Sequence, residues 1–298
     1  MIANSFFTLI KDRLRSILAG RHQEGGSLIL PFGGLITCRK KQLIRSVSFH
    51  KPGLILVING TKSVYFQERR IACRAGEMLA VPALSRFDMT NQPQGAEDLY
   101  LALFLEFNRR LIERLRLNYG AITARDRSAK QHKLHFKGNE MLYEAVFHYL
   151  QIVDLPGMDT EVLEHRLLGV LLCLVTQKPS LHMLLSLSDH WQERVYSILL
   201  AEPGRRWKVA DICAKLAVSE STLRRRLKEE GTDYHTILAD LRLNLALTQV
   251  QMTYLPIYEV ALNCGYQSAS QFTRRFRERF GVTPTALRES RSFYPMTI

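Results

Sequence analysis

The fold of this chain is best approached from residues 257–281, which read IYEVALNCGYQSASQFTRRFRERFG. The pattern predicts a short apolar helix and then a tight turn at Gly265. Ser268 stands where a helix N-cap is expected, because its hydroxyl can accept a hydrogen bond from a free N–H of the next helix. Phe272 and Phe276 are four residues apart and share one helical face. This arrangement is typical of a helix-turn-helix, whose second helix enters the major groove of DNA.

The same pattern occurs a second time in residues 209–231, which read VADICAKLAVSESTLRRRLKEEG. Ser219 takes the capping position, and Leu223 and Leu227 take the apolar positions. Many helical hairpins resemble one helix-turn-helix, but a duplicated pattern with an arginine cluster on each second helix is specific. Residues 234–252 predict one long helix that holds the two units apart, so their sites on one face of a duplex would lie roughly 10 bp apart.

The polar face of each second helix carries side chains suited to reading and holding DNA. Arginine can pair with guanine and glutamine with adenine, whereas serine can contact a base or a phosphate. A subset of cations is better placed for phosphates, which position a protein without reading sequence; these are Arg226, Lys228, Arg275 and Arg279. The predicted DNA-binding residues are Ser221, Thr222, Arg224, Arg225, Arg226, Lys228, Ser270, Gln271, Arg274, Arg275 and Arg277.

Composition agrees with a nucleic-acid partner and disfavours several other classes. The 298 residues carry 41 Lys and Arg against 28 Asp and Glu, a net charge of +13, and 46% are hydrophobic. This is ordinary globular composition, and the length predicts two domains. Five cysteines without C-x-x-C spacing fit a reducing compartment. Charges interrupt the N-terminal segment, and the longest apolar run, 167–175, is too short for a membrane span, so we expect a cytoplasmic protein.

The N-terminal half predicts a β-rich domain. Residues 1–20 predict a short amphipathic helix that stops at Gly20. From residue 28 to about 107, short apolar runs alternate with turn residues, which predicts a small antiparallel barrel or sandwich. Asn59-Gly60 lies between two of these runs and predicts a type I′ hairpin, because that turn needs positive φ at both central residues.

Helical periodicity then returns, and the chain divides in two. Apolar stripes occur in residues 108–118, 139–152 and 160–176, and the third segment is apolar enough to predict burial on most sides. A linker is expected within 177–189. The expected fold class is α+β, with an antiparallel barrel and helical elements over 1–180 and an all-α domain with two helix-turn-helix units over 188–292.

Residues 190–290 resemble the DNA-binding domain of AraC-type (AraC/XylS) transcription regulators. The first unit departs from the usual pattern, because Cys213 stands where alanine is common and Ala217 where glycine is common. The N-terminal half is similar to the cupin-like regulatory domains of that family in residues 51–62, 76–82 and 99–103. Most of the resemblance lies in the second unit, in Ile257, Val260, Ala261, Cys264, Gly265, Tyr266, Ser270, Phe272, Phe276, Arg277 and residues 280–284.

The resemblance implies a sequence-specific regulator that binds double-stranded promoter DNA. It further implies that the cupin-like barrel senses a small effector or dimerises, and that its helices serve the dimer. A homodimer is expected, with RNA polymerase as a further partner and no membrane partner. The same resemblance favours activation of transcription over repression.

Two questions about the barrel stay open at this point. Its apolar interior can be a filled core or can hold an apolar effector, and in the second case we expect contacts from Leu56, Ile58, Phe66, Val81 and Leu103. The alternative to an effector-controlled regulator is a ligand-independent architectural DNA-binding protein whose barrel only dimerises.

An enzymatic reading finds little support in the residues. A metal-dependent cupin needs clustered His and carboxylate ligands on neighbouring strands, whereas the predicted barrel offers only His50. His132 and His135 fall in a basic, loop-like stretch outside that barrel, so we expect them to be solvated. Phosphate-binding glycine motifs and nucleophile motifs do not occur in the sequence. We therefore expect no enzyme activity, no catalytic residue, no bound metal and no cofactor.

Overall fold

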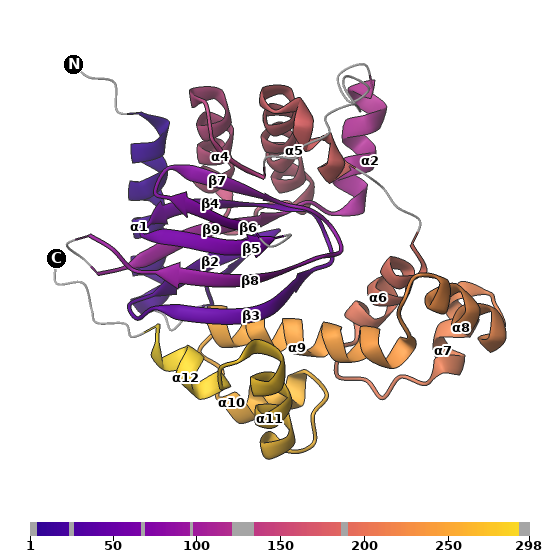
Figure 1. The fold of residues 1–298 in the computed structure, drawn as a ribbon. Helices are drawn as coiled ribbons and strands as arrows, with labels where there is room; N and C mark the ends of the chain where they lie inside the picture. The colour runs from indigo at the N-terminus through magenta and orange to yellow at the C-terminus, as the bar shows by residue number, and fades with distance from the viewer. Residues whose placement is uncertain are drawn as a thin grey trace.

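The computed structural model describes residues 5–23, 27–66, 69–95, 98–120, 134–185 and 190–291. It has a β-rich N-terminal half and a helical C-terminal half, which confirms the expected α+β class (Figure 1). The strands are β1 (Ile29–Leu30), β2 (Gly33–Cys38), β3 (Gln42–Phe49), β4 (Gly53–Asn59), β5 (Thr61–Phe66), β6 (Arg69–Arg74), β7 (Glu77–Val81), β8 (Ser85–Gln92), β9 (Tyr100–Glu106) and β10 (His135–Lys137).

The strands form two antiparallel sheets that face each other. One sheet has the order β1-β2-β9-β4-β7-β10 and the other the order β3-β8-β5-β6. Ile55 of the first sheet and Phe87 of the second lie in one buried cluster, so the space between the sheets is a hydrophobic core. Residues on β4 are buried on both faces, because the other face of this sheet is covered by helices.

The hairpin predicted at Asn59-Gly60 is wrong. β4 pairs with β7 and β9, whereas β5 pairs with β6 and β8, so the chain crosses from one sheet to the other at this point. Of the two residues only Gly60 has a positive φ, +81°, whereas a type I′ turn needs two. The glycine is required for a second reason, since a Cβ at this position would lie 2.5 Å from the carbonyl oxygen of Gln92.

A helical layer covers the six-stranded sheet (Figure 1). It consists of α1 (Phe6–Gln23), α2 (Arg109–Asn118), α4 (Glu140–Ile152) and α5 (Thr160–Gln177). Helix α1 continues through Gly20, so the predicted stop there is wrong; a glycine inside an exposed helix costs only about 1 kcal/mol. Residues 167–175 of α5 are all buried or half-buried and pack within the same chain, whereas the first turns of the helix keep exposed residues, among them Val162.

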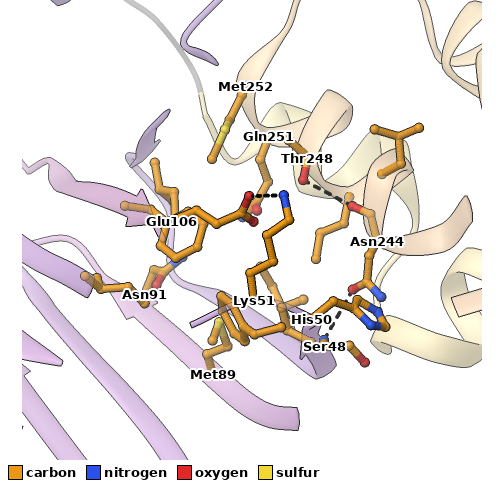
Figure 2. Close-up of a pocket in the computed structure, with 18 of the residues that line it drawn as sticks. Ser48, His50, Lys51, Met89, Asn91, Glu106, Asn244, Thr248, Gln251 and Met252 are labelled. Carbon is orange, nitrogen blue, oxygen red and sulfur yellow. Dashed lines mark hydrogen bonds and ion pairs between the residues drawn. The ribbon is translucent and has the colours of Figure 1, made fainter. Parts of the chain in front are cut away.

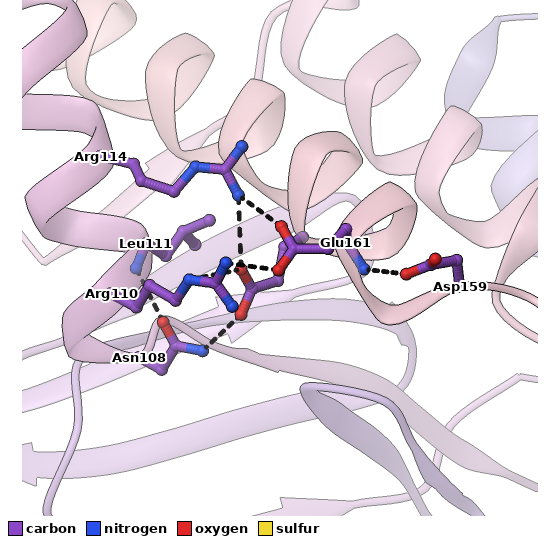
Figure 3. A network of polar contacts seen from close by, with 7 residues as sticks. Asn108, Arg110, Leu111, Arg114, Asp159 and Glu161 are labelled. Carbon is purple, nitrogen blue, oxygen red and sulfur yellow. Dashed lines mark hydrogen bonds and ion pairs between the residues drawn. The ribbon is translucent and has the colours of Figure 1, made fainter.

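An ion-pair network fixes α2 against α5 (Figure 3). Arg110 and Arg114 of α2 both contact Glu161, and Arg114 Nη1 also lies 3.4 Å from Glu164 Oε2. Asn108 caps α2 and donates a 3.1 Å hydrogen bond to the same Glu164, whose side chain is only 4% exposed. Arg110 Nε also lies 3.7 Å from Glu164 Oε2, so three side chains face the buried carboxylate and offset its desolvation.

The C-terminal half is built around one long helix, α9 (Tyr234–Met252), which runs below the strands in Figure 1. The first unit, α6 (Trp191–Ala201), α7 (Val209–Leu216) and α8 (Glu220–Glu229), packs on its N-terminal part. The second unit, α10 (Ile257–Asn263), α11 (Ala269–Phe280) and α12 (Pro284–Glu289), packs on its C-terminal part. Residues of this second unit share a core with both sheets, so it is seated directly on the barrel.

The segments that connect the two halves differ in part from what the sequence predicts. Part of the predicted linker is a short 3-10 helix, Pro179–Leu185, and residues 186–189 lie outside the described ranges. His135 lies in β10, which pairs with β7 at the edge of the six-stranded sheet, so its expected place in a loop outside the barrel is wrong. His132 is not among the described residues. Within the described ranges, every helix is too short or too polar to cross a membrane.

The corner at Gly60 generates the first prediction. In Gly60→Ala the new methyl group meets the Gln92 carbonyl, and the backbone conformation itself is unfavourable for alanine, so we expect a loss of stability of at least about 1–3 kcal/mol. Gly157→Ala is the matched control, because Gly157 also has positive φ (+70°) but has no atom near its Cβ position. Urea unfolding should show a clearly larger loss for Gly60→Ala; equal losses would contradict the steric account.

Candidate nucleic-acid interface and interdomain cavity

The first helix-turn-helix forms around a left-handed residue. Ala217 ends α7 with φ +54°, and Val218 N–H then donates to the carbonyl of Cys213. Ser219 caps α8 by accepting a 3.2 Å hydrogen bond from Thr222 N–H. Leu223, on the inner face of α8, is buried in the core of this unit. The sequence thus folds locally as expected, even though alanine takes the place where a glycine would be free of strain.

The outer face of α8 carries the predicted DNA-binding residues, and they are exposed apart from the half-buried Thr222. Its arginines are paired with glutamates of the same helix. Arg224 lies 2.7 Å from Glu220, and Arg226 lies 3.4 Å from Glu229, which also faces Arg225 at 3.9 Å. Such exposed pairs are weak, so a phosphate can displace the glutamate at small cost. The remaining exposed residues of the predicted set are Ser221 and Lys228.

The second helix-turn-helix repeats this geometry with a glycine at the turn. Gly265 has φ +79°, and Ser268 caps α11 by accepting a hydrogen bond from Gln271 N–H. On the inner face, the rings of Phe272 and Phe276 lie 5.6 Å apart, and the helix is anchored by this aromatic packing.

The outer face of α11 differs from that of α8 in its charge pairing. Arg274 and Arg277 are exposed and form no ion pair with any residue that the structure describes. Arg275 reaches Glu278 only at 4.0 Å. A shallow surface hollow here is lined by Ala269, Ser270, Thr273, Arg274, Arg277, Glu278 and Thr283. The predicted set on α11, completed by the exposed Gln271, therefore forms one open cationic surface whose role in DNA binding stays a prediction.

Arg279 does not belong to this surface, so its predicted phosphate contact is wrong. Its side chain points to the barrel, where Nη2 lies 2.5 Å from Asp240 Oδ1 and donates a 2.7 Å hydrogen bond to Ser48 Oγ. Arg86 of β8 contacts the same carboxylate at 3.2 Å, and His50 lies 3.5 Å from it. Asp240 and the four residues around it join α9, α11 and the barrel, and we call these five residues the interdomain ion cluster. The four are Ser48, His50, Arg86 and Arg279.

Electrostatics in the interdomain ion cluster favour the charged carboxylate. Burial acts to raise the pKa of Asp240, but the contact with His50 and the charges of Arg279 and Arg86 outweigh it and hold the pKa below its usual 3.8. Burial lowers the pKa of Arg279 below its usual value, against the raising effect of Asp240. A depressed acid pKa means that the folded state is stabilised by the ionised form.

The five residues predicted to contact an effector are not brought together. Leu56, Ile58 and Leu103 lie in the core between the six-stranded sheet and the helices, whereas Phe66 and Val81 face the space between the sheets. The expectation that all five line one barrel interior is therefore wrong. A strand buried on both faces carries no polar residue to mark its inner side, so alternation alone cannot assign the face.

A cavity of about 240 Å³ lies instead between the barrel and helices α6 and α9, and none of the five residues lines it (Figure 2). Its walls are mostly apolar, with side chains such as Met89, Phe104 and Leu247. Lys51 and Glu106 point toward each other across it and form an ion pair at 2.7 Å. An apolar space with a few convergent polar groups is the usual form of a small-molecule site.

Lys62 is the unusual residue of this cavity. It is 1% exposed, and Nζ donates a 2.8 Å hydrogen bond to Asn91 Oδ1, while no carboxylate among the described residues pairs with it. Burial lowers its pKa from 10.5 to about 8. The sequence held a signal that was missed: in the alternating run of β5, Lys62 shares its face with the buried Val64, so a charged residue points inward.

Hydrogen bonds continue from Lys62 to the helical half. Asn91 Nδ2 donates to Gln42 Oε1 at 2.8 Å, and Gln42 Nε2 donates to Ser290 Oγ at 2.7 Å, all between buried side chains. Ser290 follows α12, so one buried chain of polar contacts runs from the cavity to the second helix-turn-helix unit.

Both halves of the chain match models of known protein families. Residues 212–290 match the family model described as a helix-turn-helix domain, and residues 34–182 match the model of the AraC-type transcriptional regulator N-terminus. The HTH-type transcriptional regulator GadX of Escherichia coli is 35% identical over 103 residues, which is 35% of this chain and 38% of that protein. The ornithine utilization regulator of Pseudomonas aeruginosa is 40% identical over 97 residues, 33% of this chain and 29% of its own. The chain thus spans well under half the length of these curated relatives.

Solved structures match nearly the whole fold. Apo ToxT from Vibrio cholerae superposes with a TM-score of 0.63 at 14% identity, over 87% of this chain and 97% of that one. Wild-type ToxT bound to an unsaturated fatty acid gives a TM-score of 0.60 at 12% identity, over 89% and 95% of the two chains. At this identity the likeness establishes a shared fold.

The interdomain ion cluster generates the second prediction. Asp240→Asn should lower the free energy of unfolding by about 1–3 kcal/mol at pH 7, because buried hydrogen bonds to charged groups are lost. The folded-state pKa is depressed, so the contribution of Asp240 is present above pH 3.8 and disappears as pH falls through the folded-state value. Urea unfolding at pH 7 and at a series of pH values falling through and below 3.8 should therefore show the difference between the two proteins shrinking as the pH falls. Glu113→Gln, which breaks an exposed pair with Arg109, is the control and should have little effect.

Proposed function

The chain belongs to the AraC-type transcriptional regulators, and we propose that it controls promoters through α8 and α11 in response to an amphipathic carboxylate bound between its halves. The observation that carries the DNA-binding part is the pair of exposed cationic helices mounted on one long helix, α9. Arg274 and Arg277 are the best candidates for base contacts, since no acidic side chain described in the structure competes for them.

The remaining features of the proposal follow from the family and the surface. An activator is proposed because a relative 32% identical over 99 residues is described as the transcriptional activator FapR of Escherichia coli. We propose that two copies associate through α2 and α5, where Leu117 and Val162 expose large apolar side chains. RNA polymerase is the proposed partner at the promoter, no enzyme activity is proposed, and the place of action is the cytoplasm, where promoter DNA is found.

The effector class is proposed from the cavity. ToxT, which shares the fold, has been solved with an unsaturated fatty acid and with a naphthalenyl butenoic acid. Here the apolar walls would receive the hydrocarbon part of such a molecule, and Lys62 would receive its carboxylate. Lys51 is less suited, because Glu106 already neutralises it. A buried amine without an acidic partner gains a charge-assisted bond when an anion enters.

A route from the cavity to the DNA-binding helices supports effector control. Asn244 and Leu247 of α9 line the cavity, and Asn244 Oδ1 accepts a 3.2 Å hydrogen bond from Ser48 N–H of β3. A ligand that displaces these contacts changes how α9 rests on the barrel, and both helix-turn-helix units move with α9. Promoter occupancy then depends on the differential affinity of the ligand for the two placements.

The DNA-binding proposal is tested by selecting genomic fragments with the full chain at two salt concentrations and sequencing them. We expect a motif with two parts roughly 10 bp apart. Arg274→Ala should relax the preference at one base position and cost about 1–3 kcal/mol, whereas Lys228→Ala should weaken all sequences alike and make the salt slope shallower by about one unit.

Each other outcome of that selection is informative. Binding that depends steeply on salt but yields no motif, with or without ligand, would favour the architectural alternative. An unchanged base preference in Arg274→Ala would remove that residue from the reading surface. Absence of binding at low salt would overturn the proposed function.

The effector proposal is tested by measuring the binding of oleate and of its methyl ester with isothermal titration calorimetry. Lys62→Met should weaken oleate binding about 10- to 100-fold, since a charge-assisted bond is lost, while the ester binds both proteins alike. Because the pKa of free Lys62 is about 8, oleate affinity of the unaltered protein should fall by about tenfold per pH unit above that value. Lys41→Met, at an exposed site, is the control; equal oleate affinity in all three proteins would refute the role of Lys62.

A further inference from the structure

A cluster of possible metal ligands lies at one edge of the barrel, where Cys73 is the cross-strand partner of Lys62. Cys73 is near the end of β6, Glu77 begins β7 and His135 begins β10. One donor atom from each, the Cys73 sulfur, a Glu77 oxygen and a His135 nitrogen, lies within 4.8 Å of the other two. His135 Nε2 and Glu77 Oε2 are 2.9 Å apart.

Local structure explains why these three residues meet. The turn between β6 and β7 is closed by Gly76, whose φ is +81°, so Cys73 and Glu77 come together across it. In the antiparallel pairing of β10 with β7, His135 is opposite Leu79 and Lys137 is opposite Glu77. His135 and Glu77 are therefore diagonal neighbours on one face, a separation that long side chains bridge.

The donor set suits a zinc ion. Zn²⁺ is bound by thiolate, imidazole and carboxylate groups at about 2.0–2.3 Å, which places the donors of a tetrahedral site about 3.3–3.8 Å apart. The observed spacing needs only small side-chain movements to reach these values. A mixed sulfur, nitrogen and oxygen set disfavours Mg²⁺ and Ca²⁺, which take oxygen ligands.

The surroundings hold the ligands in place and leave a route to solvent. Arg74 N–H donates a 2.7 Å hydrogen bond to Glu77 Oε2, and Tyr143 of α4 donates one to the Gly76 carbonyl. Such outer partners orient ligands in metal sites. The Cys73 side chain is buried, whereas those of Glu77 and His135 are about one-third exposed, 29% and 33%.

We propose that Cys73, Glu77 and His135 bind one zinc ion, with water as a fourth ligand. Coordination replaces the thiol proton of Cys73, which passes to solvent. His135 binds the ion through Nε2 as the neutral tautomer with its proton on Nδ1, so the Nε2–H hydrogen bond to Glu77 is exchanged for two bonds to the metal. The ion then joins the β6–β7 turn to β10, the strand that leads into α4. This site is separate from the proposed effector cavity, because none of its three residues lines that cavity.

The test uses the full chain, stripped with a chelator and titrated with Zn²⁺ in a calorimeter. We expect the unaltered protein to bind one ion per chain. His135→Gln and Cys73→Ser should each weaken the affinity for Zn²⁺ by more than about 100-fold, since even the partners that orient metal ligands contribute about 10- to 100-fold to metal affinity. Glu77→Gln should weaken binding in the same direction. His148→Gln and Cys173→Ser, on α4 and α5, are controls that remove the same groups elsewhere and should bind normally.

A second readout separates ligation from loss of folding. Co²⁺ bound to the unaltered protein and to Cys173→Ser should show the near-ultraviolet sulfur-to-cobalt absorption of a thiolate ligand, and Cys73→Ser should lack it while its circular dichroism matches that of the unaltered protein. If the unaltered protein binds no more Zn²⁺ than His135→Gln, or if the cobalt absorption persists in Cys73→Ser, the cluster is an ordinary ion pair beside a buried thiol and the proposal is overturned. Promoter binding is not measured here, so the outcome is independent of the proposed function.

Discussion

Apolar side chains on the C-terminal part of α9 pack into the same core as strands of both sheets, while Ile237 and Leu241, nearer its start, pack into the core of the first helix-turn-helix unit. One helix therefore belongs to two cores. Displacement of α8 relative to the barrel has to act through this packing, whereas α11 also contacts β3 directly, and the interdomain cavity is lined by α9 as well. The apolar residues concerned are Leu243, Ala246, Leu247 and Val250.

The helical half was predictable because its signals are local. Each signal depends only on residues within one or two helical turns: a capping serine, a turn residue, or an apolar pair four residues apart. Ser268, Gly265 and Phe272 therefore take the positions that the pattern predicted. Arg279 shows the limit of this reasoning. Its position on α11 suggests an exposed cation like its neighbours. Its partner Asp240 lies on another helix, however, and no local pattern reveals that contact.

The barrel was predictable as a class but not in its connections or its binding site. Asn59-Gly60 has hairpin chemistry, yet a corner between two sheets also needs a glycine, and only the long-range pairing of β4 with β9 decides between them. The cavity arises where two halves meet, so its residues are scattered along the chain and share no motif. The three residues of the proposed zinc site were each visible, but their meeting depends on β10 pairing with β7.

The stiffness of α9 has a consequence for the DNA rather than for the protein. Its 19 residues form an uninterrupted rod about 28 Å long, comparable to one turn of the duplex, and both helix-turn-helix units are packed onto it. A protein of this kind cannot adjust the distance between its two recognition helices. A duplex whose own geometry does not present both sites at that spacing has to bend or change its groove width, and the energy of that deformation depends on base pairs that no side chain touches. Promoters would then be distinguished partly by the flexibility of the segment between the two contact sites.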